Sequence, residues 1–293
     1  MNCGILIVAT GEKYVAEAMP LIASIRQYMP DVPLAVVTDL TTPIPEGHFD
    51  IIDRADMDLS DVAPNHHGFM FRDYALMRTP FDYTIHIDTD TIFGGSTYEL
   101  FHALKRFELL VAAAPSKVRG YGVSSDTMAT DDMVSFPVVP RVNCGFMAYR
   151  KSAITSGFFD HWIELYKKGI DYAAKNGRPK FSDQSVFRRA IWDSTINYQM
   201  MPPEYNFRTG SPQYLDGLVR IAHGRPPMGR ELFMQYINSF EGRRLYVPYR
   251  EMIFQAEDTN WNRKAVLTNL EYQTWLRENN LSKPKIKPVY ANA

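Results

Sequence analysis

Short continuous apolar runs alternate, along the first part of the chain, with longer segments in which apolar residues recur every three or four positions. The runs are typical of strands buried on both faces, and the spaced pattern is typical of amphipathic helices. We predict strands over Gly4–Ala9, Leu34–Thr38, Phe49–Asp53, Tyr83–Ile87 and Leu109–Ala114, and helices over Val15–Met29, Phe69–Met77 and Ser96–Phe107. Ser96 and Glu99 match a capping box that would open the last of these helices. Strand, helix and strand in repetition predict an α/β fold with a mostly parallel central sheet flanked by helices.

The pattern loosens in the second part of the chain. Residues 115–140 are rich in Gly, Ser, Asp and Pro and predict a long polar loop, of the kind that often forms a lid or a binding loop. After it we predict a strand over Val142–Tyr149, helices over Ala153–Lys175 and Asp183–Trp192, and a strand over Leu218–Ala222. The final residues contain a helical segment, a short strand (RRLYVP) and a basic tail.

Composition limits the classes of partner and compartment. The 293 residues carry a net charge of -1, from 32 basic and 33 acidic residues, so we expect no nucleic acid held by bulk charge. Cys3 and Cys144 form no CxxC pair, which indicates neither a zinc knuckle nor a disulfide framework. The N-terminal apolar run lacks a preceding basic region and predicts a strand, and no run approaches the roughly 18 residues of a transmembrane segment. These features predict a cytoplasmic protein, and they do not predict its oligomeric state.

Two carboxylates follow the predicted strand Tyr83–Ile87, in the stretch HIDTDTIF. Residues two apart in a strand point to the same face, so Asp88 and Asp90 would converge at the carboxyl end of the strand. Ligands bind at this edge of open α/β sheets, and two hard oxygen donors there suit Mg²⁺ or Mn²⁺. The alternative is a solvated turn in which one aspartate caps the loop backbone.

Other segments place this D-x-D in a recognisable order. The stretch MFRDYALMRTPFDYTIHIDTDTIF is followed by NCGFMAYRKS, SDQSVF and IAHGRP, and the chain opens with IVATGEKY. In this order the segments resemble a glycosyltransferase of the GT-A fold, nearest to glycosyltransferase family 8 and related nucleotide-diphospho-sugar transferases. The resemblance covers roughly Ile5–Arg230. It implies a GT-A (Rossmann-like) catalytic domain over residues 1–230 and, over residues 231–293, a smaller acceptor-side C-terminal helical extension packed on the same domain.

The resemblance also implies roles for individual residues. Asp88, Asp90 and His223 match the metal ligands, and an imidazole beside two carboxylates favours Mn²⁺ over Mg²⁺. Three residues, Asn143, Asp183 and Gln184, match those that orient the sugar at the reacting centre. The remaining donor-binding positions are Thr10, Tyr14, Arg72, Thr89, Gly145, Gly224 and Arg225.

Several of these residues also have plainer interpretations. The Tyr14 ring would stack on a uracil or pack on the sheet as a helix-start aromatic. Arg72 would reach the phosphate or sugar of the donor or be a solvated helix charge. Asp183 would contact a sugar hydroxyl, cap the helix that follows it, or do both. His223 would be a metal ligand or a hydrogen-bonded histidine at a strand end.

The histidine segment departs from the family pattern. The family continues it as H-x-x-G-x-x-K-P-W, whereas this chain reads HGRPPMGR, with glycine directly after the histidine and no Lys-Pro-Trp. Arg225 or Arg230 would then replace the lysine that contacts the diphosphate. Cys144 stands where a small residue is usual.

Taken together, these features predict a metal-dependent glycosyltransferase of the hexosyltransferase type. It would move a sugar from a UDP-sugar to an unidentified glycan, protein or small-molecule acceptor, with retention of configuration by the resemblance. Two alternatives remain. A haloacid dehalogenase-like phosphatase would use Asp88 as nucleophile and Asp90 as acid/base, but it needs the motif on its first strand and a later acidic pair, for which only Asp131 and Asp132 are available. The other alternative is a non-catalytic nucleotide-sugar-binding relative.

Overall fold

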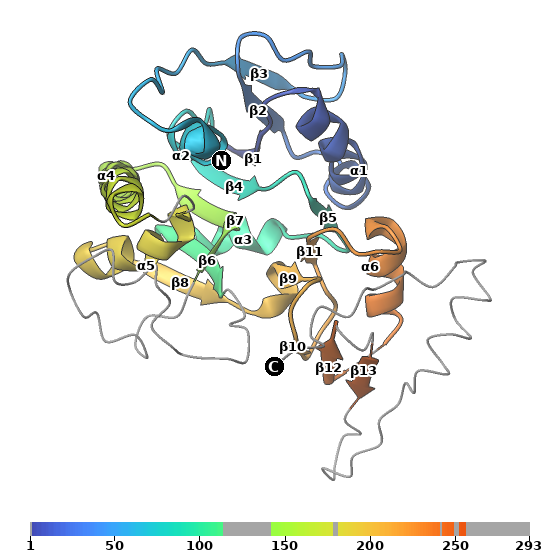
Figure 1. The fold of residues 1–293 in the computed structure, drawn as a ribbon. Coiled ribbons are helices and arrows are strands. Elements are labelled where there is room, and N and C mark those ends of the chain that lie inside the picture. Colours follow the sequence, from blue (N-terminus) through green and yellow to red (C-terminus); the bar gives the residue numbers. More distant parts are fainter. Residues whose placement is uncertain (1, 114–141, 178–180, 241, 249–251, 256–293) are drawn as a thin grey trace.

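The apolar runs assemble into one central sheet. The computed structural model describes residues 2–113, 142–177, 181–240, 242–248 and 252–255. Within them a seven-stranded sheet has the order β3-β2-β1-β4-β7-β6-β8 (Figure 1). Its strands are β1 (Cys3–Val8), β2 (Leu34–Thr38), β3 (Ile51–Arg54), β4 (Tyr83–Ile87), β6 (Leu109–Ala113), β7 (Val142–Arg150) and β8 (Tyr198–Met201). Strands β1 to β4 are parallel, β6 and β8 are parallel, and β7 runs antiparallel to its neighbours β4 and β6.

Helices cover both faces of this sheet because successive strand residues point to opposite sides. Ile5 and Ile7 pack with α1 (Glu12–Tyr28) and α3 (Tyr98–Ala103), while Leu6 between them packs with the helices of the other face. Those helices are α2 (His67–Leu76), α4 (Ala153–Lys175) and α5 (Asp183–Asp193). The predicted mostly parallel α/β sheet flanked by helices is therefore confirmed.

Two small sheets and a third apolar cluster lie beyond the carboxyl edge of β4. One sheet contains β5 (Thr91–Phe93), β11 (Ile221–His223) and β9 (Phe207–Arg208), and the other contains β10 (Gln213–Leu215), β12 (Arg244–Val247) and β13 (Met252–Gln255). Helix α6 (Arg230–Asn238) packs against them, and single 3-10 turns span Pro64–His66 and Pro203–Tyr205. The link 88–90 therefore joins the central sheet to the sheet that carries His223.

Several elements differ from the sequence prediction, since the helix predicted over Ser96–Phe107 spans only Tyr98–Ala103 and the strand predicted over Phe49–Asp53 spans Ile51–Arg54. The predicted strand Leu218–Ala222 is shorter, and it joins β5 in a small sheet. The capping box before α3 is wrong, because Thr97 is the N-cap residue, makes no side-chain capping bond, and donates its hydroxyl to Met29 Sδ at 3.2 Å. The predicted polar loop lies outside the described residues, and the division at residue 230 stays a prediction. Across the described ranges, every helix is too short or too polar to cross a bilayer.

Candidate active site

A cavity of about 590 Å³ lies at the carboxyl ends of β1 and β4. Most of the residues singled out in the sequence line it: Thr10, Tyr14, Arg72, Asp88, Thr89, Asp90, Asn143, Gly145, Gln184, His223 and Arg225. Two others, Asp183 and Gly224, are not part of this lining. The structure thus gathers residues from six separate segments at one edge of the sheet, where open α/β folds bind their ligands.

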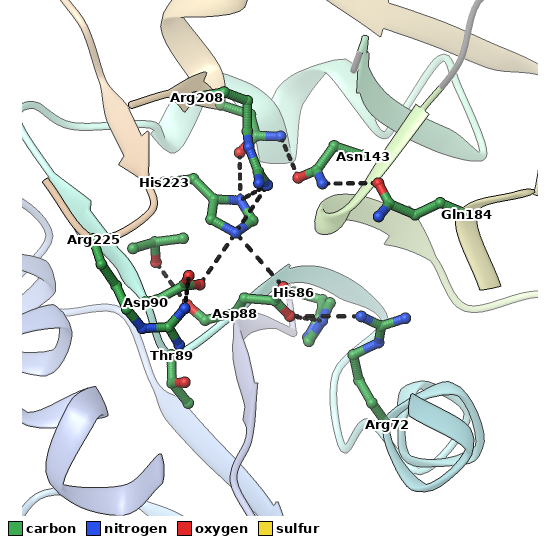
Figure 2. A network of polar contacts seen from close by, with 12 residues as sticks. Arg72, His86, Asp88, Thr89, Asp90, Asn143, Gln184, Arg208, His223 and Arg225 are labelled. Atoms are coloured by element: carbon green, nitrogen blue, oxygen red, sulfur yellow. Dashed lines mark hydrogen bonds and ion pairs between the residues drawn. The ribbon is translucent and has the colours of Figure 1, made fainter. Parts of the chain in front are cut away.

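Two aspartates and a histidine meet at the centre of this cavity. Asp88 follows β4 and Asp90 precedes β5, while His223 ends β11, the strand that pairs with β5. His223 Nε2 lies 3.1 Å from Asp90 Oδ1 and 3.7 Å from Asp88 Oδ2 (Figure 2). One ligand atom from each residue lies within 4.8 Å of the other two. Two carboxylates and one imidazole in this arrangement fit a divalent cation such as Mn²⁺.

The surroundings keep both carboxylates charged. Burial raises the pKa of Asp88, but contacts with His86, Arg72 and His223 outweigh it and hold that pKa below its usual range. Burial likewise raises the pKa of Asp90, and contacts with His223 and Arg225 lower it overall. Two neighbouring carboxylates that both stay ionised favour a cation bound between them.

A row of amide hydrogen bonds ends at Nδ1 of His223, the ring nitrogen that does not face the carboxylates. Asn206 Nδ2 donates to Asn143 Oδ1, and Asn143 Nδ2 donates to Gln184 Oε1, each at 2.9 Å. Asn206 therefore turns its Oδ1 toward His223 Nδ1, at 3.0 Å. Because this oxygen can only accept, it favours a proton on Nδ1, which would leave the Nε2 lone pair to a metal. This is the tautomer that binds a metal through Nε2.

Two glycines allow the chain to pack closely around the cluster. A Cβ on Gly145 would collide with His223 and Asp88, and the Gly145 carbonyl accepts from Asp88 N at 2.9 Å. Gly224 has a φ of 124°, which side chains rarely adopt, and its N–H donates to Asp90 O at 2.9 Å. Gly145 thus leaves room for the cluster, whereas Gly224 acts through its backbone.

Arg72 lies in a buried ion-pair network. Its Nη2 contacts Asp73 Oδ1 at 2.8 Å and also Asp183 Oδ2, while its Nη1 lies 3.8 Å from Asp88 Oδ1. The interpretation of Arg72 as a solvated helix charge is therefore wrong. The cap of α5 is also reassigned, because Ser182 is the N-cap residue, with its Oγ accepting from Gln184 N, and Asp183 is fully buried in the first turn.

The Tyr14 ring lines the cavity and is exposed to solvent. Helix α1 begins after Gly11, and Tyr14 lies in its first turn with 42% of its surface exposed. Lys13 Nζ lies 5.5 Å from the ring centroid. The ring therefore does not pack on the sheet, and the stacking role stays a prediction supported by this exposure.

Arg225 and Arg230, the two arginines considered as replacements for the family lysine, both form contacts within the protein. Arg225 contacts Glu17 through Nε at 2.6 Å and Asp90 through Nη1 at 2.9 Å. Arg230 donates to three backbone oxygens, those of Thr89, Thr91 and Glu17. The Thr89 hydroxyl also donates to Glu17, at 2.8 Å. This contact network joins α1 to the segment after β11.

Sequence reasoning missed Asn206, Arg208 and the exposed Phe69, although Arg208 and Phe69 line the cavity. No motif identified them. Strand register alone reveals Arg208, because β9 pairs with β11 and places Arg208 beside His223.

The phosphatase alternative requires the D-x-D motif at the end of the first strand of the fold. Here the motif follows β4, in the interior of the sheet, which disfavours that alternative. The acidic pair Asp131 and Asp132 lies outside the described residues.

Comparison of whole structures finds proteins with a similar fold, whereas comparison of sequences finds no match. No protein-family model and no curated protein matches the sequence. The apo structure of mouse xyloside xylosyltransferase 1 superposes with a TM-score of 0.53 at 14% identity, covering 76% of this chain and 98% of that one. An active-site mutant of LgtC gives 0.51 at 15% identity, covering 80% and 95%. In a further structure LgtC is described as a galactosyltransferase complexed with donor and acceptor sugar analogs, with a TM-score of 0.49, 13% identity, and 77% and 88% coverage.

These structural neighbours are glycosyltransferases, and the first of them is covered almost end to end. At this level of identity the similarity establishes the fold. The protein therefore has the GT-A fold that the order of its sequence motifs predicts.

Proposed function

We propose that the protein is a metal-dependent glycosyltransferase that moves a sugar from a UDP-sugar to an acceptor hydroxyl. The observation that carries the proposal is the cluster of Asp88, Asp90 and His223 at the centre of the cavity. The GT-A fold supports it, because the cluster lies where this architecture binds its ligands.

Different residues of the cavity would contact different parts of the UDP-sugar donor. Asp88, Asp90 and His223 would hold Mn²⁺, which when bound would neutralise the diphosphate and stabilise UDP as a leaving group. The exposed Tyr14 ring would stack on the uracil, with Thr10 beside it. Asn143 and Gln184 would orient the sugar hydroxyls, since their amides face the cavity and are held by hydrogen bonds.

The proposed reaction exchanges one bond at the sugar. The bond between the anomeric carbon and the β-phosphate oxygen breaks, and its electron pair remains on UDP. The acceptor oxygen forms the new bond to that carbon and loses its proton, so the products are the glycosylated acceptor, UDP and one proton. Retention of configuration is expected from the family resemblance.

The test is calorimetric titration of UDP into the purified protein, first with Mn²⁺ and then with EDTA. We expect binding that requires Mn²⁺ and that disappears in an Asp88→Asn, Asp90→Asn double variant with an unchanged melting temperature. UDP affinity that persists in EDTA, or in the double variant, contradicts the metal site. If UDP binds as expected, screening UDP-sugars for slow hydrolysis identifies the donor and separates an enzyme from a non-catalytic relative.

A further inference from the structure

Three arginines line the cavity in the described part of the chain, and they differ in how much of their charge is already compensated. Arg72 contacts three carboxylates in the buried network. Arg225 lies between Glu17 and Asp90, with 61% of its side chain exposed. A guanidinium already paired with carboxylates must give up those contacts before it can bind an anionic ligand.

Arg208 is placed differently. Its Nη1 lies 3.0 Å from both ring nitrogens of His223 (Figure 2), and it forms no ion pair with a carboxylate among the residues that the structure describes. Burial lowers its pKa, while Asp90 and Asp88 act in the opposite direction. An arginine stays protonated at neutral pH even so, and Arg208 therefore presents a positive charge beside the cluster that no carboxylate of the described residues pairs with directly.

We propose that Arg208 binds the diphosphate of the donor and stabilises the charge that collects on UDP as it leaves. This role rests on the proposed function and assigns the diphosphate contact that the family lysine would otherwise supply. Arg230 is unsuited to it, because its guanidinium is bound to three backbone oxygens and does not line the cavity. A diphosphate held at the metal cluster would come within reach of the guanidinium that already touches His223, and the planar fork of arginine matches phosphate oxygens.

The position of Arg208 gives this proposal a distinctive consequence. A positive charge beside the metal ligands repels a divalent cation and attracts a diphosphate. Removing the charge should therefore weaken UDP binding without weakening the binding of Mn²⁺ alone. A residue that only supported His223 would weaken both.

The experiment compares Arg208→Gln and Arg208→Lys with the wild-type protein. Arg243→Gln is the matched control, because Arg243 is an exposed arginine of the same C-terminal region whose ion pair, within the described residues, is with the exposed Asp216 at 3.4 Å. Mn²⁺ is titrated alone, and then UDP, UMP and uridine are titrated at saturating Mn²⁺. Thermal unfolding verifies that each variant is folded.

We expect Arg208→Gln to weaken UDP binding by about 10- to 100-fold, the usual effect of losing hydrogen bonds to a charged group. Uridine affinity should not change, Mn²⁺ alone should bind equally well or more tightly, and Arg208→Lys should lose only part of the UDP affinity. An unchanged UDP affinity, or an equal loss for Mn²⁺ and UDP, overturns the proposal. Failure of the wild-type protein itself to bind UDP with Mn²⁺ overturns the proposed function, and this role with it.

Discussion

Asn206 is the residue whose replacement most directly tests how His223 is held. Its Oδ1 accepts from His223 Nδ1 at 3.0 Å, and its Nδ2 donates to Asn143 Oδ1 at 2.9 Å. Asn206 is 1% exposed, so water cannot take over either bond. In Asn206→Leu, which keeps the branching of the side chain but carries no polar atom, both partners lose their hydrogen bonds and the Nδ1 proton of His223 is no longer fixed.

Hydrogen-bond partners of metal-ligating histidines usually contribute about 10- to 100-fold to metal affinity, or roughly 1.4–2.7 kcal/mol. We expect a loss of this size for Mn²⁺ in Asn206→Leu. Asn206→Asp should behave differently, because a carboxylate still accepts from Nδ1 and makes the imidazole a stronger ligand. It should keep the Mn²⁺ affinity and instead weaken sugar-nucleotide binding, since the donor to Asn143 is gone.

The assay is Mn²⁺ titration by calorimetry, with thermal unfolding of each variant. Asn238→Leu is the control, because Asn238 is a partly buried asparagine that donates to Val219 O at 2.9 Å and accepts from Val219 N at 2.8 Å, away from the cluster. It should lower the melting temperature without changing Mn²⁺ affinity. If Asn206→Leu binds Mn²⁺ as tightly as the wild-type protein, the proposed tautomer and its role are refuted.

Three further predictions concern other parts of the site. Gly145→Ala should remove most Mn²⁺ affinity and destabilise the fold by about 1–3 kcal/mol, because its Cβ collides with two ligands; metal titration and urea unfolding measure these effects, and near wild-type values would contradict the close packing. Tyr14→Ala should weaken UDP binding by about 1–3 kcal/mol, whereas Tyr14→Phe should not, as the ring and not its hydroxyl stacks on the base; equal losses in both variants would exclude stacking. Asp39 accepts from Thr41 and Thr42, and although burial raises its pKa, these bonds lower it overall. Its contribution to stability is therefore present above its ordinary pKa of about 3.9 and is lost as the pH falls through the lower folded value. Urea unfolding should thus find wild type more stable than Asp39→Ala at pH 6, with a difference that shrinks toward pH 3; a difference independent of pH would show that the carboxylate charge is not involved.

The central sheet could be predicted from sequence because its strands are continuous apolar runs separated by helical spacing. Leu34–Thr38 and Tyr83–Ile87 are predicted to the residue, since both are buried apolar strands with an aspartate directly after them. The direction of β7 could not be predicted, because an apolar run carries no information about which way its strand runs. The strand Ile221–His223 begins three residues after the start of the predicted Leu218–Ala222, and it pairs with β5 rather than with the central sheet.

The candidate site could be predicted only where its residues belong to local motifs. Asp88 and Asp90 share one strand end, and the spacing along a strand already predicts that they converge. Arg72 was a helical arginine with no local sign that it meets Asp183, which is 111 positions away. Asn206 and Arg208 likewise reach the site through strand pairing and the fold around it, which a single sequence does not reveal.

The ligand cluster is formed by residues from two sheets, the central sheet and the small sheet that contains β11. Asp88 belongs to the end of the central sheet, while His223 belongs to a small sheet that rests on its own apolar cluster. Asn206 donates a hydrogen bond to Asn143 on β7, and Asn143 donates one to Gln184 on α5. The geometry of the proposed metal site therefore depends on how the C-terminal sheet packs against the central one, and any movement between them would change the metal ligands and the sugar-facing amides together. Proper alignment of the donor sugar and tight metal binding are, on this view, two consequences of a single packing arrangement.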